Sequence, residues 1–154
     1  MVIVQTIVLI IIVDEDVPLP VRKPGFDGGL ELMSKAYEFL KECGAFFVLT
    51  INEDYPAGRP FGAVMEVDDY LYLSTNDLNE AHKQLRNNGH IQIVAKKPDS
   101  REWIRITGIA AECNDGILKQ QMLEECPILK QRFGTVGIEH FIMFKVKTEN
   151  VEIK

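Results

Sequence analysis

The chain has 154 residues, 46% of them hydrophobic and 26% charged, which excludes a disordered tail, a collagen-like rod and a disulfide-stapled miniprotein. Acidic residues outnumber basic ones by 23 to 17, and no stripe of Lys and Arg interleaved with aromatic residues indicates a nucleic-acid surface. The three cysteines form no C-x-x-C pair, which favours free thiols and a cytoplasmic protein over a disulfide framework.

The chain begins with an almost uninterrupted apolar run over residues 2–13, and a Pro- and Gly-rich stretch follows as far as residue 29. The run is shorter than the about 20 residues that a transmembrane helix needs. Acidic residues follow it in place of the small-residue cleavage site of a signal peptide, so we expect no membrane association. We expect residues 1–29 to form an arm and connector that packs against the domain or a partner subunit, and residues 30–154 to form the domain.

Helical spacing opens the domain, because apolar residues recur three and four positions apart over residues 30–43. Six runs that are typical of strands follow, over residues 45–51, 59–67, 70–75, 91–96, 102–112 and 141–151. Turn-type connections predict that the first three strands form an antiparallel meander. A short helix is expected after the third strand, where Asp77 and Glu80 resemble a capping box, and further helices over residues 116–125 and 128–133.

Short antiparallel strands with helices as connectors predict a small barrel, because closure of a sheet removes its exposed edges. The expected fold class is therefore mainly β with α additions. The sequence lacks the G-x-G-x-x-G, P-loop, H-E-x-x-H and G-x-S-x-G motifs, so the common dinucleotide, phosphate-hydrolysis, zinc-protease and serine-hydrolase sites are unsupported. His82, His90 and His140 lie on separate expected elements without ligand spacing, and no metal site is expected.

A candidate anion site is indicated where the third strand runs into the short helix. Ser74 and Thr75 lie there, so two hydroxyls and the first unpaired backbone N–H groups could converge on one anion. Arg59, one strand away, has a forked cation suited to phosphate. Pro60 and Gly62 favour a strand edge or a close approach of a flat ligand. A helix cap and a surface salt bridge are the simpler roles for the two hydroxyls and for Arg59.

Four short motifs carry a resemblance to a known family. They are RPFG at residues 59–62, YLST at 72–75, KQLRNN at 83–88 and WIRITG at 103–108. Together they resemble the FMN-binding split-barrel family of pyridoxamine-phosphate-oxidase-like proteins. The resemblance implies a six-stranded antiparallel split barrel that binds FMN at a homodimer interface, with the phosphate at the strand–helix junction and the ring against the RPFG strand. The cofactor-binding residues are then expected to be Arg59, Pro60, Phe61, Gly62, Ser74, Thr75, Asn79, Lys83, Trp103 and Arg105.

The implied function is that of an oxidoreductase that passes hydride from a reduced nicotinamide, NAD(P)H, through FMN to a small substrate. Two departures of this sequence from the family pattern bear on the implied function. The family commonly has a lysine where this chain has Asn79, and the last strand lacks the arginine-and-histidine signature by which true pyridoxamine-phosphate oxidases hold their substrate. A true pyridoxamine-phosphate oxidase is therefore not expected. A flavin-binding protein without turnover, and a relative that binds haem, deazaflavin or another ligand, stay open as alternatives, and no catalytic residue is identified.

Overall fold

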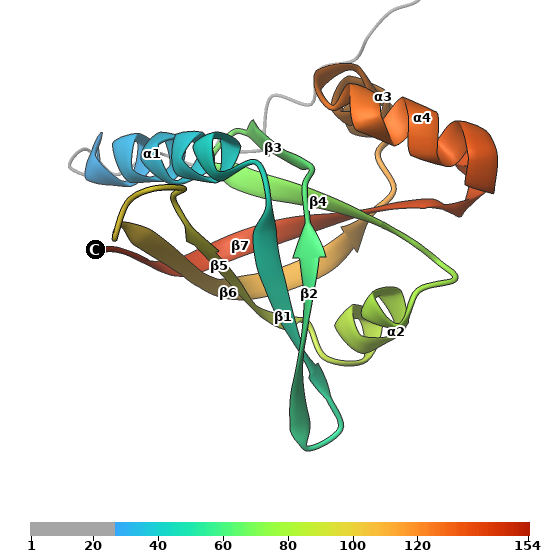
Figure 1. Ribbon diagram of the computed structural model, residues 1–154. Coiled ribbons are helices and arrows are strands. Elements are labelled where there is room, and N and C mark those ends of the chain that lie inside the picture. Colours follow the sequence, from blue (N-terminus) through green and yellow to red (C-terminus); the bar gives the residue numbers. More distant parts are fainter. Residues whose placement is uncertain (1–26) are drawn as a thin grey trace, which may run out of the picture.

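A computed structural model describes residues 27–154, which form one strongly curved antiparallel sheet with helices at its ends and on one face (Figure 1). The helices are α1 (Asp27–Cys43), α2 (Glu80–Asn87), α3 (Gly116–Glu125), α4 (Pro127–Val136) and the 3-10 helix η1 (Ile138–His140). The strands are β1 (Phe46–Asn52), β2 (Tyr55–Phe61), β3 (Val64–Val67), β4 (Tyr70–Asn76), β5 (His90–Lys96), β6 (Trp103–Cys113) and β7 (Phe141–Ile153). The mainly β class with α additions is confirmed, whereas the predicted packing of residues 1–26 lies outside the described residues.

The prediction of a single strand over residues 59–67 is wrong, because the chain breaks at Gly62 and Ala63 and forms β2 and β3. The sheet therefore has seven strands rather than six, in the order β2-β1-β5-β6-β7-β4-β3. β2 and β3 lie at opposite ends of this order although only two residues connect them. A connection of that length spans roughly 10 Å, so the sheet must curl until its two edges approach each other. This arrangement gives the expected split barrel, in which the edges meet without strand pairing.

Two hairpins replace the predicted meander. β1 pairs with β2, and β3 pairs with β4, both antiparallel. In the second hairpin Asp68 and Asp69 have φ of 49° and 67°, the left-handed values that a two-residue type I′ turn requires at both positions. The predicted turn at residues 68–69, and the antiparallel pairing across it of residues 64–67 with β4, are therefore confirmed. β4 also pairs with β7, whereas β2 pairs with β1.

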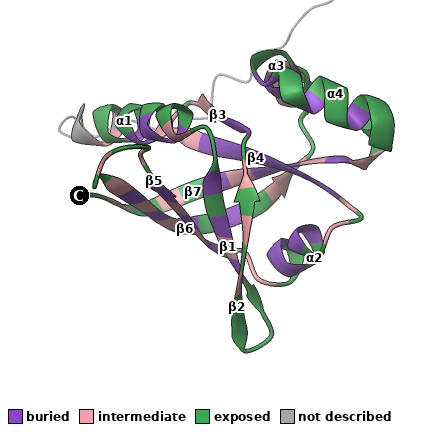
Figure 2. Cartoon of the chain, viewed as in Figure 1, coloured by how far each residue is buried: buried purple, intermediate pink, exposed green. Residues whose placement is uncertain are grey.

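The main core lies on the inner, concave face of the sheet. α1 closes one end of it, because Met33, Ala36 and Leu40 recur at helical spacing and are all buried. Figure 2 shows the purple face of α1 turned toward the strands. α2 lies at the other end of the barrel in Figure 1 and buries Leu85 in the same core. No helix among residues 27–154 is long and apolar enough to span a membrane.

A second, smaller core lies on the outer face of the sheet, over β3, β4 and β7. The α3–α4 pair covers it and contributes Met122, Leu129 and Phe133. The Phe133 ring meets that of Phe141 at a centroid distance of 4.9 Å. Over β2, β1, β5 and β6, no helix of residues 27–154 lies on the same outer face (Figure 1), and Phe47 there is 57% exposed.

Candidate functional site

Arg59 is the centre of a group of polar contacts on the inner face. It lies in edge strand β2 directly opposite Val48 of β1, whose side chain belongs to the inner core. Arg59 Nη1 donates to Thr50 Oγ1 and Arg59 Nη2 donates to Gln84 Oε1, each at 2.6 Å. The Thr50 hydroxyl donates to the same Gln84 oxygen at 2.6 Å. A closed triangle of hydrogen bonds therefore links β1, β2 and α2.

The charge of Arg59 has no carboxylate partner among residues 27–154. Arg86 and Arg105, by contrast, pair with Glu112 and Glu152. Burial lowers the pKa of the Arg59 guanidinium from its ordinary value, because removal from water disfavours the charged form. The group still stays protonated near neutral pH. Since only two of its five N–H donors bond to described residues, the remaining donors and the positive charge are available to an anion.

Ser74 and Thr75 do not act together as predicted. Both belong to β4, where successive side chains point to opposite faces of the sheet. Thr75 pairs with Ile142, which packs against the inner core, and Ser74 pairs with Met143, which belongs to the outer core. The expectation that their hydroxyls converge on one anion is therefore wrong. Thr75 is on the same side of the sheet as Arg59.

The N-terminus of α2 also differs from the prediction. The helix begins at Glu80, and its N-cap Asn79 makes no side-chain cap bond, so the expected capping box of Asp77 with Glu80 is absent. Asp77 Oδ1 instead lies 2.6 Å from His140 Nδ1, and Lys83 Nζ donates to Glu80 Oε1 at 2.6 Å. Both carboxylates that would repel a phosphate thus have a partner of their own. Lys83 is exposed and is bound to Glu80 rather than directed to a site with Arg59.

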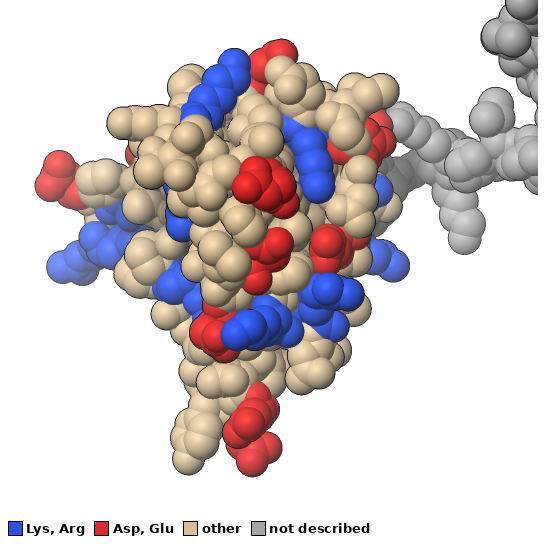
Figure 3. Space-filling view, turned by 90° about the vertical axis from the view of Figure 1, so that its right-hand side faces the viewer, with Lys and Arg blue, Asp and Glu red and all other residues tan. Residues whose placement is uncertain are grey.

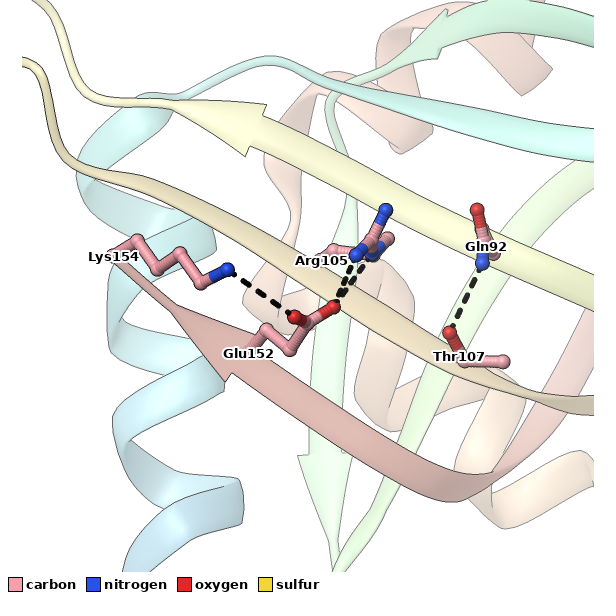
Figure 4. A network of polar contacts seen from close by, with 5 residues as sticks. All are labelled: Gln92, Arg105, Thr107, Glu152 and Lys154. Atoms are coloured by element: carbon pink, nitrogen blue, oxygen red, sulfur yellow. Dashed lines mark hydrogen bonds and ion pairs between the residues drawn. The ribbon is translucent and has the colours of Figure 1, made fainter.

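Trp103 and Arg105 alternate along β6 with Ile104 and Ile106 of the inner core, so they lie on the outer face. A second polar network runs across β5, β6 and β7 there (Figure 4). Arg105 Nε donates to Glu152 Oε2 at 2.7 Å, a second bond forms from Arg105 Nη2, and Lys154 lies near the same carboxylate. The bond from Arg105 is the main reason that the pKa of Glu152 is lowered. The cations of Arg105 and Lys154 each lie 5.6 Å from the centre of the Trp103 ring. This network is adjacent to the hydrogen bond between Gln92 and Thr107.

Strand register shows which side chains share this outer face. Pro60 pairs with Phe47, Phe47 with Val94, Val94 with Arg105, and Arg105 with Glu152. Directly paired residues of neighbouring strands point to the same side. One row therefore crosses the uncovered part of the sheet from the edge strand to β7, and it combines apolar and charged groups.

The predicted cofactor residues thus fall into separate groups. Arg59 and Thr75 face inward, whereas Pro60, Trp103 and Arg105 face outward. Their positions on opposite faces mean that one chain does not bring both groups to one ligand.

The remaining predicted residues lie apart from both groups. Phe61 packs its ring against Phe46 at 6.4 Å and so belongs to the edge of the inner core. Gly62 lies in the β2–β3 connection, where an added Cβ would be 3.5 Å from the Gly44 carbonyl oxygen, an ordinary contact. The absence of a side chain at Gly62 is therefore no evidence that a ligand approaches the backbone there.

Sequence reasoning missed Thr50 and Gln84. The alternation of Phe46, Val48 and Thr50 was the available signal, since it places a hydroxyl on the inner face of an otherwise apolar strand. Gln84 is a buried glutamine beside Leu85 in α2, and nothing in its local pattern distinguishes it from a solvated helix residue. Among residues 27–154, no three His, Cys, Asp or Glu side chains are grouped so that they could hold a metal ion.

Residues 32–152 match the model of a protein family described as pyridoxamine 5'-phosphate oxidase. No curated protein sequence matches the chain. Among solved structures, a NimC/NimA family protein from Clostridium acetobutylicum is 32% identical, with a TM-score of 0.71 over 80% of this chain and 91% of that one.

More distant structures share the fold. A FAD-binding protein from Mesorhizobium loti is 13% identical, with a TM-score of 0.58 over 78% of this chain and 91% of that one. HutZ, the haem storage protein of Vibrio cholerae, is 14% identical, with a TM-score of 0.63 over 80% of this chain and 94% of that one. At such identities the similarity is one of fold, and the fold is used by proteins named for flavin and for haem.

Proposed function

The chain belongs to the pyridoxamine 5'-phosphate oxidase family, and from this premise we propose that it is a flavoprotein that binds FMN between two subunits and acts as an oxidoreductase. The observation that carries the proposal is the guanidinium of Arg59. It is held in place by two neutral oxygens and has no carboxylate partner among the described residues. A fixed and uncompensated cation beside a helix is suited to a phosphate group.

The residues that would hold the phosphate fit such a group in charge and in rigidity. Arg59 keeps free N–H donors, and Thr50 and Gln84 fix its orientation from β1 and α2. The acidic residues at the N-terminus of α2 are occupied, Asp77 by His140 and Glu80 by its own helix neighbour. Among residues 27–154, a phosphate placed there therefore meets the available cation of Arg59 and two carboxylates that already have partners.

The positions of Trp103 and Arg105 on the outer face lead us to propose that a second copy of the chain completes the site. Trp103 and Arg105 cannot reach a ligand held by Arg59 of the same chain, because they lie on the other side of the sheet. A second copy that packs its outer face against the first would bring an aromatic ring and a guanidinium to that ligand. The exposed Phe47 beside Pro60 gives such an interface an apolar centre. We therefore propose a homodimer with two equivalent sites.

FMN, when bound, supplies a flavin that exchanges hydride with a reduced nicotinamide and with a small substrate. The protein's own contribution is to anchor the phosphate through Arg59 and to exclude water from the ring by the apolar face around Phe47. Among residues 27–154 we assign no acid or base to the site, and hydride transfer does not require one.

Cofactor binding is tested by the absorbance spectrum of the freshly purified protein, since flavin and haem absorb differently in the visible range. FMN and riboflavin are then titrated by fluorescence quenching into the wild type and into Arg59→Ala. We expect the substitution to weaken FMN by about ten- to a hundredfold, because a charge-assisted hydrogen bond contributes about 1.5 to 3 kcal/mol, and to leave riboflavin nearly unchanged. Arg132→Ala, an exposed arginine on α4, is the matched control.

Two results would contradict the proposal. Wild type that binds neither flavin below about 100 micromolar would mean that the chain shares the fold only. An equal loss of affinity for FMN and for riboflavin in Arg59→Ala would mean that the phosphate binds elsewhere. Turnover is tested separately, by anaerobic addition of NADH or NADPH to the loaded protein. We expect the spectrum of oxidised flavin to disappear. If it persists, the protein binds flavin but does not accept hydride from the nicotinamide.

A further inference from the structure

We propose that Gln84 is a positioning residue whose neutral side chain holds Arg59 in place without cancelling its charge, so that the site selects ligands that end in a phosphate. This inference rests on the proposed function. It assigns the selectivity of the site to a residue of α2 that does not itself need to be charged.

The hydrogen bonds fix which end of the Gln84 amide faces Arg59. Guanidinium N–H groups only donate, so the atom that meets Arg59 Nη2 at 2.6 Å must be the carbonyl oxygen. The Thr50 hydroxyl donates to the same oxygen. A flipped amide would place its NH₂ group against the guanidinium NH₂ group and lose the bond from Arg59. The oxygen of Gln84 therefore has two donors, and its orientation is determined by chemistry.

The other end of the amide is then available as a donor. Thr148 Oγ1 is the only buried side-chain polar atom of residues 27–154 that lacks a hydrogen-bond partner. Gln84 Nε2 donates to none of those residues, and Gln84 is 8% exposed. An anion beside Arg59 would thus find a second, neutral N–H donor in the same triangle.

A carboxylate at position 84 would have the opposite effect on the charge of Arg59. It would accept the same two hydrogen bonds and hold Arg59 at least as firmly, since charge-assisted bonds are the stronger ones. It would also neutralise the guanidinium and remove the amide donor. Arg105 and Glu152 on the outer face form such a neutralised pair. A purely structural role would tolerate Gln84→Glu, whereas a role in keeping the charge available would not.

The test compares two substitutions at one position. Gln84→Met removes the hydrogen bonds but stays neutral, and Gln84→Glu keeps the bonds and adds a negative charge. FMN, riboflavin and inorganic phosphate are titrated into each variant and into the wild type, with flavin fluorescence and the phosphate-induced rise in the thermal unfolding midpoint as readouts. Gln131→Glu, on the exposed surface of α4, controls for net charge.

We expect Gln84→Glu to weaken FMN by about tenfold or more, and to do so more than Gln84→Met, because a like charge beside the phosphate outweighs a lost neutral bond. Riboflavin binding and the unfolding midpoint without ligand should stay close to wild type in Gln84→Glu. The reverse order of the two variants, or equal FMN binding by Gln84→Glu and wild type, would overturn the inference and leave the proposed function standing. Wild type that binds neither FMN nor phosphate would overturn both.

Discussion

Asn79 occupies a place from which a side chain reaches the end of β4. Its Nδ2 atom lies 3.4 Å from Thr75 Oγ1, on the side of the sheet to which Arg59 also points. The resemblance to the family expects a lysine at this position. An amide supplies a donor without a charge, so the anchoring of an anion here depends on Arg59 to a greater degree than the family pattern implies.

Asn79→Lys is therefore expected to raise FMN affinity, by a few-fold to about tenfold, because an added cation beside the site strengthens its attraction for phosphate. Riboflavin, which lacks the phosphate, should bind as it does to wild type. Fluorescence titration of both ligands measures the difference. Asn87→Lys, at the exposed C-terminal end of the same helix, changes net charge equally and should have no such effect. An unchanged FMN affinity in Asn79→Lys would place the phosphate away from the start of α2.

At the residue scale, the sequence allowed the identification of Arg59 but not of the residues that hold it. Arg59 begins the RPFG motif, which carries part of the resemblance to the family. Thr50 and Gln84 are 34 positions apart, and they meet because α2 packs over the end of β1. Contacts of this range depend on the tertiary fold, and no local pattern encodes them.

At the scale of elements, the break between β2 and β3 has a partial explanation in the sequence. Pro56 and Pro60 lack an N–H donor, which confines β2 to an edge of the sheet. That signal was available and is confirmed. The position of the break was not predictable, because Gly62 followed by Ala63 is not a turn dipeptide and the run continues with apolar residues. The crossing to the opposite edge comes from closure of the whole sheet.

Gly108 is required by the pairing of β6 with β7. The register shifts between Thr107 and Gly108, and an added Cβ at Gly108 would fall within 3.0 Å of the Lys147 carbonyl oxygen. Gly108→Ala is expected to lower the free energy of unfolding by about 1 to 3 kcal/mol, because the backbone of β7 must move to relieve the clash. Urea unfolding monitored by circular dichroism measures this loss.

Gly134→Ala is the matched control. Gly134 lies inside α4, and apart from the backbone of its own helix and its chain neighbours nothing lies within 4 Å of an added Cβ there. This variant is expected to be as stable as wild type or more stable by up to about 1 kcal/mol, because alanine favours the helix. A Gly108→Ala protein as stable as Gly134→Ala would mean that the β6–β7 bulge adapts freely to a side chain.

At the scale of the whole molecule, the two faces of the sheet differ in what covers them. α3 and α4 cover the outer face over β3, β4 and β7, and no other described helix lies on that face over the remaining strands (Figure 1). The surface seen in Figure 3 carries Lys and Arg interspersed with Asp and Glu, without a broad patch of one sign. The net charge of −6 is thus not concentrated there. We therefore base the dimer proposal on the exposed Phe47 in the row from Pro60 to Glu152, and not on a charged patch of the surface seen in Figure 3.

The dimer proposal predicts that Phe47→Asp produces a folded monomer. Phe47 is 57% exposed in the single chain and lies in the row from Pro60 to Arg105, so the substitution places a charge in the proposed interface without disturbing the inner core. Light scattering during size-exclusion chromatography at about 10 micromolar protein should show a dimer for wild type and a monomer for Phe47→Asp, with weakened FMN binding since each site would lose the partner's outer face. Ile117→Asp, on the 81% exposed Ile117 of α3, should remain a dimer. A monomeric wild type that binds FMN tightly would show that one chain suffices for the site.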